Sequence, residues 1–252
     1  MKTLSVKRVT LWFAVTLATF TLGITITALH TSRAGSNTFR THANNPIPAT
    51  TEHDRPASRA VPSCFPGLSR SVENLNPTSY FPSGAFYPKA QHEKFIVDWY
   101  TKHLQAMAES PLLDPADSRP ETYRFLWLRS FHHPVAVRVW ASNDGHFINV
   151  KQTNGAGGYE PGTLITDQTR RLTDTEWDHF ITLLERSCYW QLSAENDEMG
   201  NDGARWILEG VRERRYHVVD RWSPQSGAFR DACLYLLNLS NPALTLSDQT
   251  TY

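Results

Sequence analysis

Glu209, His217 and Asp220 combine side chains that could carry acid–base chemistry. A carboxylate placed beside an imidazole can pass a proton to or from a substrate, so an acid–base site is one hypothesis for this region. The three residues fall on the segments 205–211 and 215–222, which we expect to pair as a β-hairpin. In that hairpin Glu209 and His217 point to opposite faces of the sheet, which favours a structural role.

The same hairpin carries the candidate ligand-binding residues Arg205, Trp206 and Arg221. An exposed tryptophan can stack on a sugar ring, and seven of the eight tryptophans follow residue 90. We favour an interpretation in which most of them belong to the core and Trp206 packs on Arg221. Arg205 and Asp220 then form a diagonal cross-strand pair. The expected register places Glu209 opposite Val218, Ile207 opposite Asp220 and Trp206 opposite Arg221.

Two other motifs give weak signals for chemistry. Neighbouring side chains of an extended strand point to opposite faces, so His132 and His133 cannot hold one ion together, and no zinc-type spacing accompanies them. The Gly157-Gly158 loop lacks the Gly-x-Gly-x-x-Gly spacing and the P-loop lysine, and it precedes a strand, not a helix. No Gly-x-Ser-x-Gly nucleophile elbow is present. We therefore expect no metal and no cofactor.

The charge distribution bears on the class of partner. The chain has 25 basic and 25 acidic side chains, but residues 1–80 carry a net charge of +5 and the remainder a net charge of −5. The mildly acidic C-terminal part argues against a nucleic-acid partner.

An uncharged apolar run near the N-terminus predicts a membrane segment. The run Val9–Leu29 is 21 residues long, carries no charge and follows three basic residues within residues 1–8. Its length favours an uncleaved transmembrane helix over a signal peptide, whose apolar core has about 7–15 residues. The preceding basic residues place residues 1–8 in the cytoplasm. A cleaved signal peptide, cut near Ser32–Ala34, is the alternative, and in both cases the rest of the chain crosses the membrane.

Composition divides the remainder into three parts. Residues 30–88 hold eight of the 15 prolines and show no apolar periodicity, which is typical of a flexible linker, although its more apolar later part could lie against the domain. Residues 89–241 are expected to form one globular domain, and residues 242–252 a polar, frayed tail.

The globular part alternates strand and helix signals without βαβ order. Four segments form an expected meander: 122–130, 135–140, 146–152 and 164–172, with a turn at Asn143-Asp144-Gly145. The hairpin 205–222 follows, closed near Glu213-Arg214. Three helices are expected: one from Pro88 with an apolar stripe from Phe95 to Met107, one with a Thr173–Glu176 capping box, and one capped at Ser223-Pro224. We predict an α+β fold with a mostly antiparallel sheet, packed with about three helices and preceded by the transmembrane helix.

Two further expectations concern the second and third of these helices. Trp177 should anchor the second helix in the core. Cys188 and Cys233 lie on apolar helix faces, and a bridge between them is possible in an oxidising compartment, but buried free thiols are favoured. Cys64, in the linker, is expected to be exposed and available to another chain.

The motifs at 202–210 (DGARWILEG) and 216–224 (YHVVDRWSP) resemble a group of bacterial exported or membrane-anchored proteins. The segments 123–139 and 157–162 fit the same group, so the resemblance spans roughly residues 85–240. It implies a bacterial setting and an extracytoplasmic domain, and it assigns no activity and no catalytic residue.

These observations favour a single-pass membrane protein whose domain binds an envelope protein or ligand. The alternative is an extracytoplasmic enzyme with an acid–base site near Glu209, His217 and Asp220. The two differ in whether polar groups converge in a concave pocket.

Overall fold

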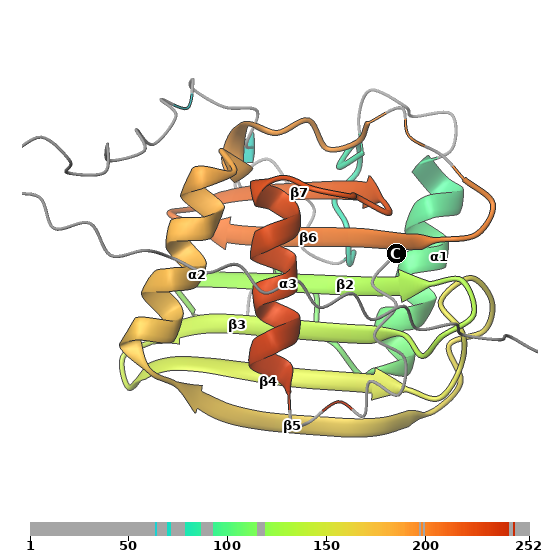
Figure 1. Cartoon of the computed structure of the whole chain (residues 1–252), viewed down its shortest axis with the longest axis horizontal. Helices are drawn as coiled ribbons and strands as arrows, with labels where there is room; N and C mark the ends of the chain where they lie inside the picture. The colour runs from blue at the N-terminus through green and yellow to red at the C-terminus, as the bar shows by residue number, and fades with distance from the viewer. Residues whose placement is uncertain are drawn as a thin grey trace, which may run out of the picture. The chain divides into compact units, whose positions relative to one another are not determined.

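Alternating apolar residues build one antiparallel sheet, which has seven strands among the described residues, in the order β1-β7-β6-β2-β3-β4-β5 (Figure 1). The computed structural model describes residues 64, 70–71, 79–86, 93–114, 119–196, 198, 200–241 and 244. The strands are β1 (Arg70–Ser71), β2 (Glu121–Arg129), β3 (Val135–Ser142), β4 (Gly145–Thr153), β5 (Leu164–Leu172), β6 (Ala204–Arg212) and β7 (Arg215–Trp222). The α-helices are α1 (Glu93–Ala106), α2 (Asp174–Arg186) and α3 (Ala228–Ser240), with a short 3-10 turn η2 (Tyr189–Gln191).

The predicted α+β class, the β2–β5 meander and the β6–β7 hairpin are confirmed. The hairpin has the expected register, with Glu209 opposite Val218 and Ile207 opposite Asp220. It pairs with β2, so the first strand of the meander lies in the middle of the sheet. Residues 213 and 214 close it with positive φ angles of 51° and 60°.

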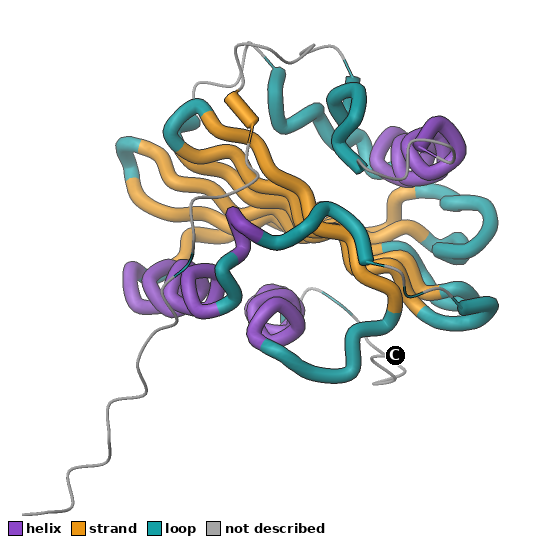
Figure 2. The backbone as a smooth tube through the Cα atoms, turned by 90° about the horizontal axis from the view of Figure 1, so that it is seen from above, coloured by secondary structure: helices purple, strands orange, loops and turns teal. Residues whose placement is uncertain are grey.

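The sheet separates two cores. Helices α2 and α3 cover one face, and α1 covers the other (Figure 2). In β2 the residues Tyr123, Phe125 and Trp127 point to the α2/α3 face, whereas Leu126 and Leu128 point to the α1 face. Because the side-chain period of a strand is two, both faces of this central strand are buried.

The start of α2 matches its sequence signal. The Thr173 side chain accepts a hydrogen bond from the Glu176 backbone N–H, and the Glu176 carboxylate accepts one from the Thr173 N–H, so the capping box is complete. Trp177 is buried in the α2/α3 core, and its ring stacks on His146 with a centroid distance of 4.5 Å. The expected burial of Trp177 in the core is confirmed.

The start of α3 differs from its prediction. The helix begins at Ala228 with Gly227 as N-cap, and Ser223 is not its cap. The Ser223 hydroxyl instead accepts a hydrogen bond from the Ala204 N–H, at 2.9 Å, so it belongs to the end of the β6–β7 hairpin. The predicted buried face of α3, which includes Phe229 and Cys233, is confirmed.

A disulfide joins Cys64 to Cys188, and the two Cα atoms lie 5.4 Å apart. The expectation of a free Cys188 thiol is therefore wrong, and a Cys188–Cys233 bridge is excluded, whereas the burial of a free Cys233 is confirmed. Cys64 pairs within its own chain and is not available to another one. Cys188 has a left-handed backbone (φ 51°) where α2 leads into η2, so it lies beyond the end of the helix on whose face the sequence placed it.

Part of the segment preceding residue 89 packs on the domain. Phe81 and Phe86 are buried against Tyr100 on the α1 face, with ring centroids 6.0 and 5.9 Å from it. Strand β1 pairs with the outer edge of β7. The packed unit thus includes residues that composition alone assigned to the linker.

No helix in the described part of the chain is long and apolar enough to cross a membrane. The expected span Val9–Leu29 lies outside the described residues. Of the expected tail 242–252 the structure describes only Leu244, and this side chain is buried in the α2/α3 core, which differs from a frayed tail at that residue.

Candidate binding site

The predicted acid–base residues are buried and do not share a site. Glu209 and Asp220 point to the α1 face, whereas His217 points to the α2/α3 face, with its ring 5.2 Å from that of Tyr189. The exposed fractions of Glu209, His217 and Asp220 are 0, 5 and 1%. A proton donor or acceptor must reach its substrate, and these three side chains are buried where no substrate can contact them, so the structure does not support an acid–base site here.

Glu209 is engaged in a buried ion pair. Its Oε2 accepts hydrogen bonds from Nε and Nη2 of Arg124, at 2.9 and 2.6 Å, and its Oε1 accepts one from the Tyr216 hydroxyl at 3.0 Å. Burial outweighs the attraction of Arg124 and raises the pKa of Glu209. The carboxylate has a structural role, since all its described partners belong to the sheet.

Asp220 has a separate set of partners. Its Oδ2 accepts a hydrogen bond from the Tyr100 hydroxyl at 2.6 Å and lies 3.5 Å from Nη1 of Arg205. The predicted diagonal pair of Arg205 and Asp220 is thus observed. Burial raises the pKa of Asp220 more than Arg205 lowers it. Tyr100 lies on α1, so this contact attaches the helix to the hairpin.

The candidate ligand-binding residues also serve the fold. Trp206 is fully buried, and it is Arg230, not Arg221, whose guanidinium lies over its ring, at 5.8 Å. Arg221 lies over Phe229 and donates to the carbonyl oxygen of Ser193. The predicted packing of Trp206 on Arg221 is therefore wrong. The two residues are cross-strand partners by register, but their side chains turn to different neighbours.

A row of polar residues crosses the α1 face from β6 to β5. Each member is the direct cross-strand partner of the next: Glu209, Arg124, Arg138, Asn149 and Thr169. Two arginines stand side by side in this row, which would be unfavourable without a counter-charge. The row is buried for most of its length, so it positions elements and does not offer a site.

Glu109, which follows α1, supplies the counter-charge. Its carboxylate contacts Arg138 at 2.8 Å, Lys151 at 3.1 Å and Arg124 at 3.5 Å. Burial disfavours its charged form, but the three cations together outweigh this effect and hold its pKa below the ordinary value. The Ser110 carbonyl oxygen accepts hydrogen bonds from both arginines. The C-terminal end of α1 is thereby fixed over the middle of the sheet.

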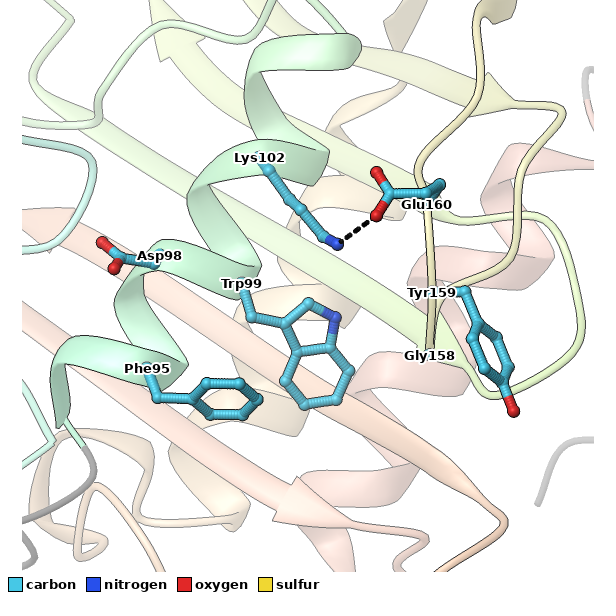
Figure 3. A pocket seen from close by; sticks show the side chains of 7 residues that line it. All are labelled: Phe95, Asp98, Trp99, Lys102, Gly158, Tyr159 and Glu160. Atoms are coloured by element: carbon cyan, nitrogen blue, oxygen red, sulfur yellow. Dashed lines mark hydrogen bonds and ion pairs between the residues drawn. The ribbon is translucent and has the colours of Figure 1, made fainter.

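At the outer side of α1 lies a pocket of about 500 Å³ between the helix and the 154–163 loop (Figure 3). Its lining side chains are Phe95, Asp98, Trp99, Lys102, Tyr159 and Glu160. In Figure 3 the rings of Phe95 and Trp99 project from α1, and Tyr159 extends from the facing loop. Three of the five exposed large apolar side chains of the described residues gather around it: Phe95, Phe131 and Tyr159.

The facing wall of the pocket is held by backbone contacts. The N–H groups of Gly157 and Gly158 donate to the carbonyl oxygens of His132 and Ser130, at 3.0 and 3.1 Å. A Cβ added at Gly157 would lie 2.6 Å from the Arg129 carbonyl oxygen, so only glycine allows this approach. The predicted sheet-connecting loop is thus pinned to the end of β2 and presents Tyr159 outward.

Two contacts join α1 to this loop across the pocket. The Trp99 Nε1–H donates to the Gly157 carbonyl oxygen at 3.0 Å, and Lys102 pairs with Glu160 at 3.2 Å. Behind them His103 is fully buried, and burial, followed by the charge of Lys102, lowers its pKa to about 4. His103 is therefore neutral near pH 7.

The sequence did not reveal this site because its apolar spacing placed Phe95 and Trp99 on the buried stripe of the first helix. At about 100° per residue, that stripe from Phe95 to Met107 spans roughly 180° of the helix surface, which is wider than one buried face requires. Tyr100 and Leu104 are fully buried, whereas Phe95, at the border of the arc, is 69% exposed. The unusual width of this apolar arc was the signal in the sequence that part of it would stay exposed.

Among the described residues no group of His, Cys, Asp and Glu could hold a metal ion, and His132 and His133 do not form one. No family model matches the chain, and no match is found among curated proteins or solved structures. The chemistry of the pocket is therefore the main guide to function: it can bind a ligand by ring stacking and by hydrogen bonds at its rim.

Proposed function

We propose that this protein is a binding module of the bacterial cell envelope, anchored by Val9–Leu29, whose ligand site is the pocket between α1 and the 154–163 loop. The observation that carries the proposal is the pocket itself: an open, aromatic-lined hollow beside the otherwise packed α1 face. Apolar rings exposed together around a concavity are typical of binding sites.

The charged groups at the pocket favour binding over catalysis. Asp98 pairs with Lys94 at 2.6 Å, and Glu160 pairs with Lys102 at 3.2 Å. An acid–base catalyst needs a free group aimed at the reacting atom, whereas these carboxylates already have cationic partners. The buried Glu209 and Asp220 lie within the sheet core, away from the pocket lining.

Three features support placement outside the cytoplasm. The uncharged run Val9–Leu29 follows basic residues, as in a signal anchor. The Cys64–Cys188 disulfide fits an oxidising compartment. The resemblance to exported or membrane-anchored bacterial proteins points the same way. Protease treatment of spheroplasts should remove the domain, and a fully protected domain would contradict the orientation; a mature N-terminus near Gly35 would contradict the anchor alone.

The pocket is tested with a library of small neutral aromatic and apolar fragments, using ligand-observed NMR on the full-length protein in nanodiscs. We expect hits that compete with one another for a single site and that are lost in Tyr159→Ser. The matched control is Phe147→Ser, since Phe147 is a partly exposed ring on β4 that stacks on Trp140 away from the pocket. Hits that survive Tyr159→Ser, or no hits, would contradict the proposed site.

A further inference from the structure

We infer that the ligand of the pocket is a neutral carbohydrate, stacked on the rings of Trp99, Tyr159 and Phe95 and hydrogen-bonded at the charged rim. This inference rests on the proposed function, because it takes the pocket to be a binding site. It adds the chemical class of the ligand.

The lining selects a ligand with a flat apolar face. Among the described residues that line the pocket, all three large apolar side chains are aromatic, and none is Leu, Ile, Val or Met. Grooves for aliphatic chains use flexible aliphatic side chains and methionine, which adapt to irregular shapes. Rigid rings instead present broad faces, on which the C–H face of a pyranose ring can stack.

The rim selects a ligand without net charge. Among the described residues of the lining the two acidic groups are Asp98 and Glu160. They pair with Lys94 and Lys102, so the charge of these four side chains sums to zero. An anionic ligand would meet two carboxylates, and a cationic ligand would compete with two lysines that already hold them. Hydroxyl groups can both donate to the carboxylates and accept from the ammonium groups without breaking this balance.

The pocket is preorganised for such a ligand. The Trp99 ring is fixed by its hydrogen bond to the Gly157 carbonyl oxygen, and it is half-buried, leaving part of its surface for contact. The Tyr159 ring, 58% exposed, lies 6.0 Å from Phe131, which extends the aromatic surface beyond the pocket. A fixed Trp99 ring loses little conformational freedom on binding, which favours ligands such as oligosaccharides whose individual contacts are weak.

The experiment follows the Trp99 indole N–H signal of the full-length protein, labelled with ¹⁵N-tryptophan and held in nanodiscs. The probes are the hexamers of maltose-type, cellulose-type and chitin-type sugars, with hexagalacturonate as the anionic comparator. We expect at least one neutral hexamer to shift the Trp99 signal. Tyr159→Ala should weaken its binding at least tenfold, because it removes a stacking face. Glu160→Gln should weaken it several-fold, because it removes the charge and one of the two acceptor oxygens of the rim carboxylate.

Phe147→Ala is the matched control, and it should leave the affinity unchanged. The inference is overturned if no neutral hexamer shifts the Trp99 signal, if hexagalacturonate alone does so, or if Phe147→Ala weakens binding as much as Tyr159→Ala. Fragment hits at the pocket without sugar binding would overturn this inference and leave the proposed function standing. If neither fragments nor sugars bind at the pocket, both this inference and the proposed function are overturned.

Discussion

Replacing Glu209 by leucine tests whether the buried polar row holds the sheet together. The change removes the acceptor of two Arg124 hydrogen bonds, at 2.9 and 2.6 Å, and of one from Tyr216 at 3.0 Å. Arg124 is 0% exposed, so its charge cannot turn to water. Its described hydrogen-bond and ion-pair partners are then the Ser110 carbonyl oxygen and Glu109 at 3.5 Å. Removing one partner of a buried ion pair costs about 3–5 kcal/mol, and we expect Glu209→Leu to fall in that range.

The double variant Arg124→Met/Glu209→Leu separates the ion pair from simple loss of packing. It removes both charges and leaves Glu109 with Arg138 and Lys151, at 2.8 and 3.1 Å. We expect it to be more stable than Glu209→Leu alone by about 1 kcal/mol or more, because no unpaired charge stays buried.

The assay is urea unfolding of the full-length protein in detergent, followed by tryptophan fluorescence, with the slope of the transition compared between variants. A Glu209→Leu variant as stable as the wild type would refute the structural role of the pair. If the double variant loses as much free energy of unfolding as Arg124→Met and Glu209→Leu lose when added together, the coupling between Arg124 and Glu209 is refuted.

Four further predictions concern other parts of the fold. Trp177→Ala should lower the free energy of unfolding by about 3–5 kcal/mol, because the ring is 6% exposed and stacks on His146; a thermal melt within a degree or two of wild type would contradict its anchoring role. The pKa of His103, lowered to about 4, means that the unfolded chain binds more protons between pH 4 and 6.5, so stability should fall as the pH drops through this window, by up to about 3 kcal/mol. Urea unfolding across this window should show a flatter profile for His103→Phe than for the wild type, and equal profiles would contradict the assignment. Cys64→Ser should cost about 2–5 kcal/mol, and non-reducing mass spectrometry should find a Cys64–Cys188 linked peptide, with Cys233 alkylated only after unfolding; rapid alkylation of Cys233 in the folded state would contradict its burial. Gly157→Ala should displace the loop, because its Cβ would lie 2.6 Å from the Arg129 carbonyl oxygen, and the Trp99 indole signal should move; an unchanged signal would show that the approach is not tight.

The strands, the hairpin register and the start of α2 could be predicted because their signals are local. Alternating residues and a closing turn determine which side chains of β6 and β7 lie opposite each other, so Glu209 opposite Val218 followed from the sequence. The Thr173–Glu176 capping box lies within four residues and needs no tertiary context.

The features that were missed depend on distant parts of the chain. Cys64 and Cys188 are 124 residues apart, and spacing alone does not determine connectivity. The polar row requires the strand order, because Arg124 meets Glu209 only when β6 pairs with β2. Phe95 looked like a core residue because helix periodicity marks an apolar arc but not the part of it that a sheet covers.

Ser223 belongs to the end of the hairpin and does not cap a helix, and this difference from the prediction also depends on a distant part of the chain. Ser-Pro is a common helix start, but the Ala204 N–H, brought near by the β6–β7 pairing, takes the hydroxyl as its acceptor. The tertiary hydrogen bond therefore overrides the local preference of Ser-Pro to start a helix.

The central claim is that the pocket between α1 and the 154–163 loop is occupied by a ligand outside the cytoplasm. Hydroxyl-radical footprinting of intact cells, compared with the purified full-length protein, tests it most directly, because exposed aromatic rings react readily. We predict that Phe95 and Tyr159, exposed by 69 and 58%, are labelled less in cells than in the purified protein, while Leu164 and Ile165 on β5 are labelled equally in both. Equal labelling of Phe95 and Tyr159 in the two samples would contradict the claim.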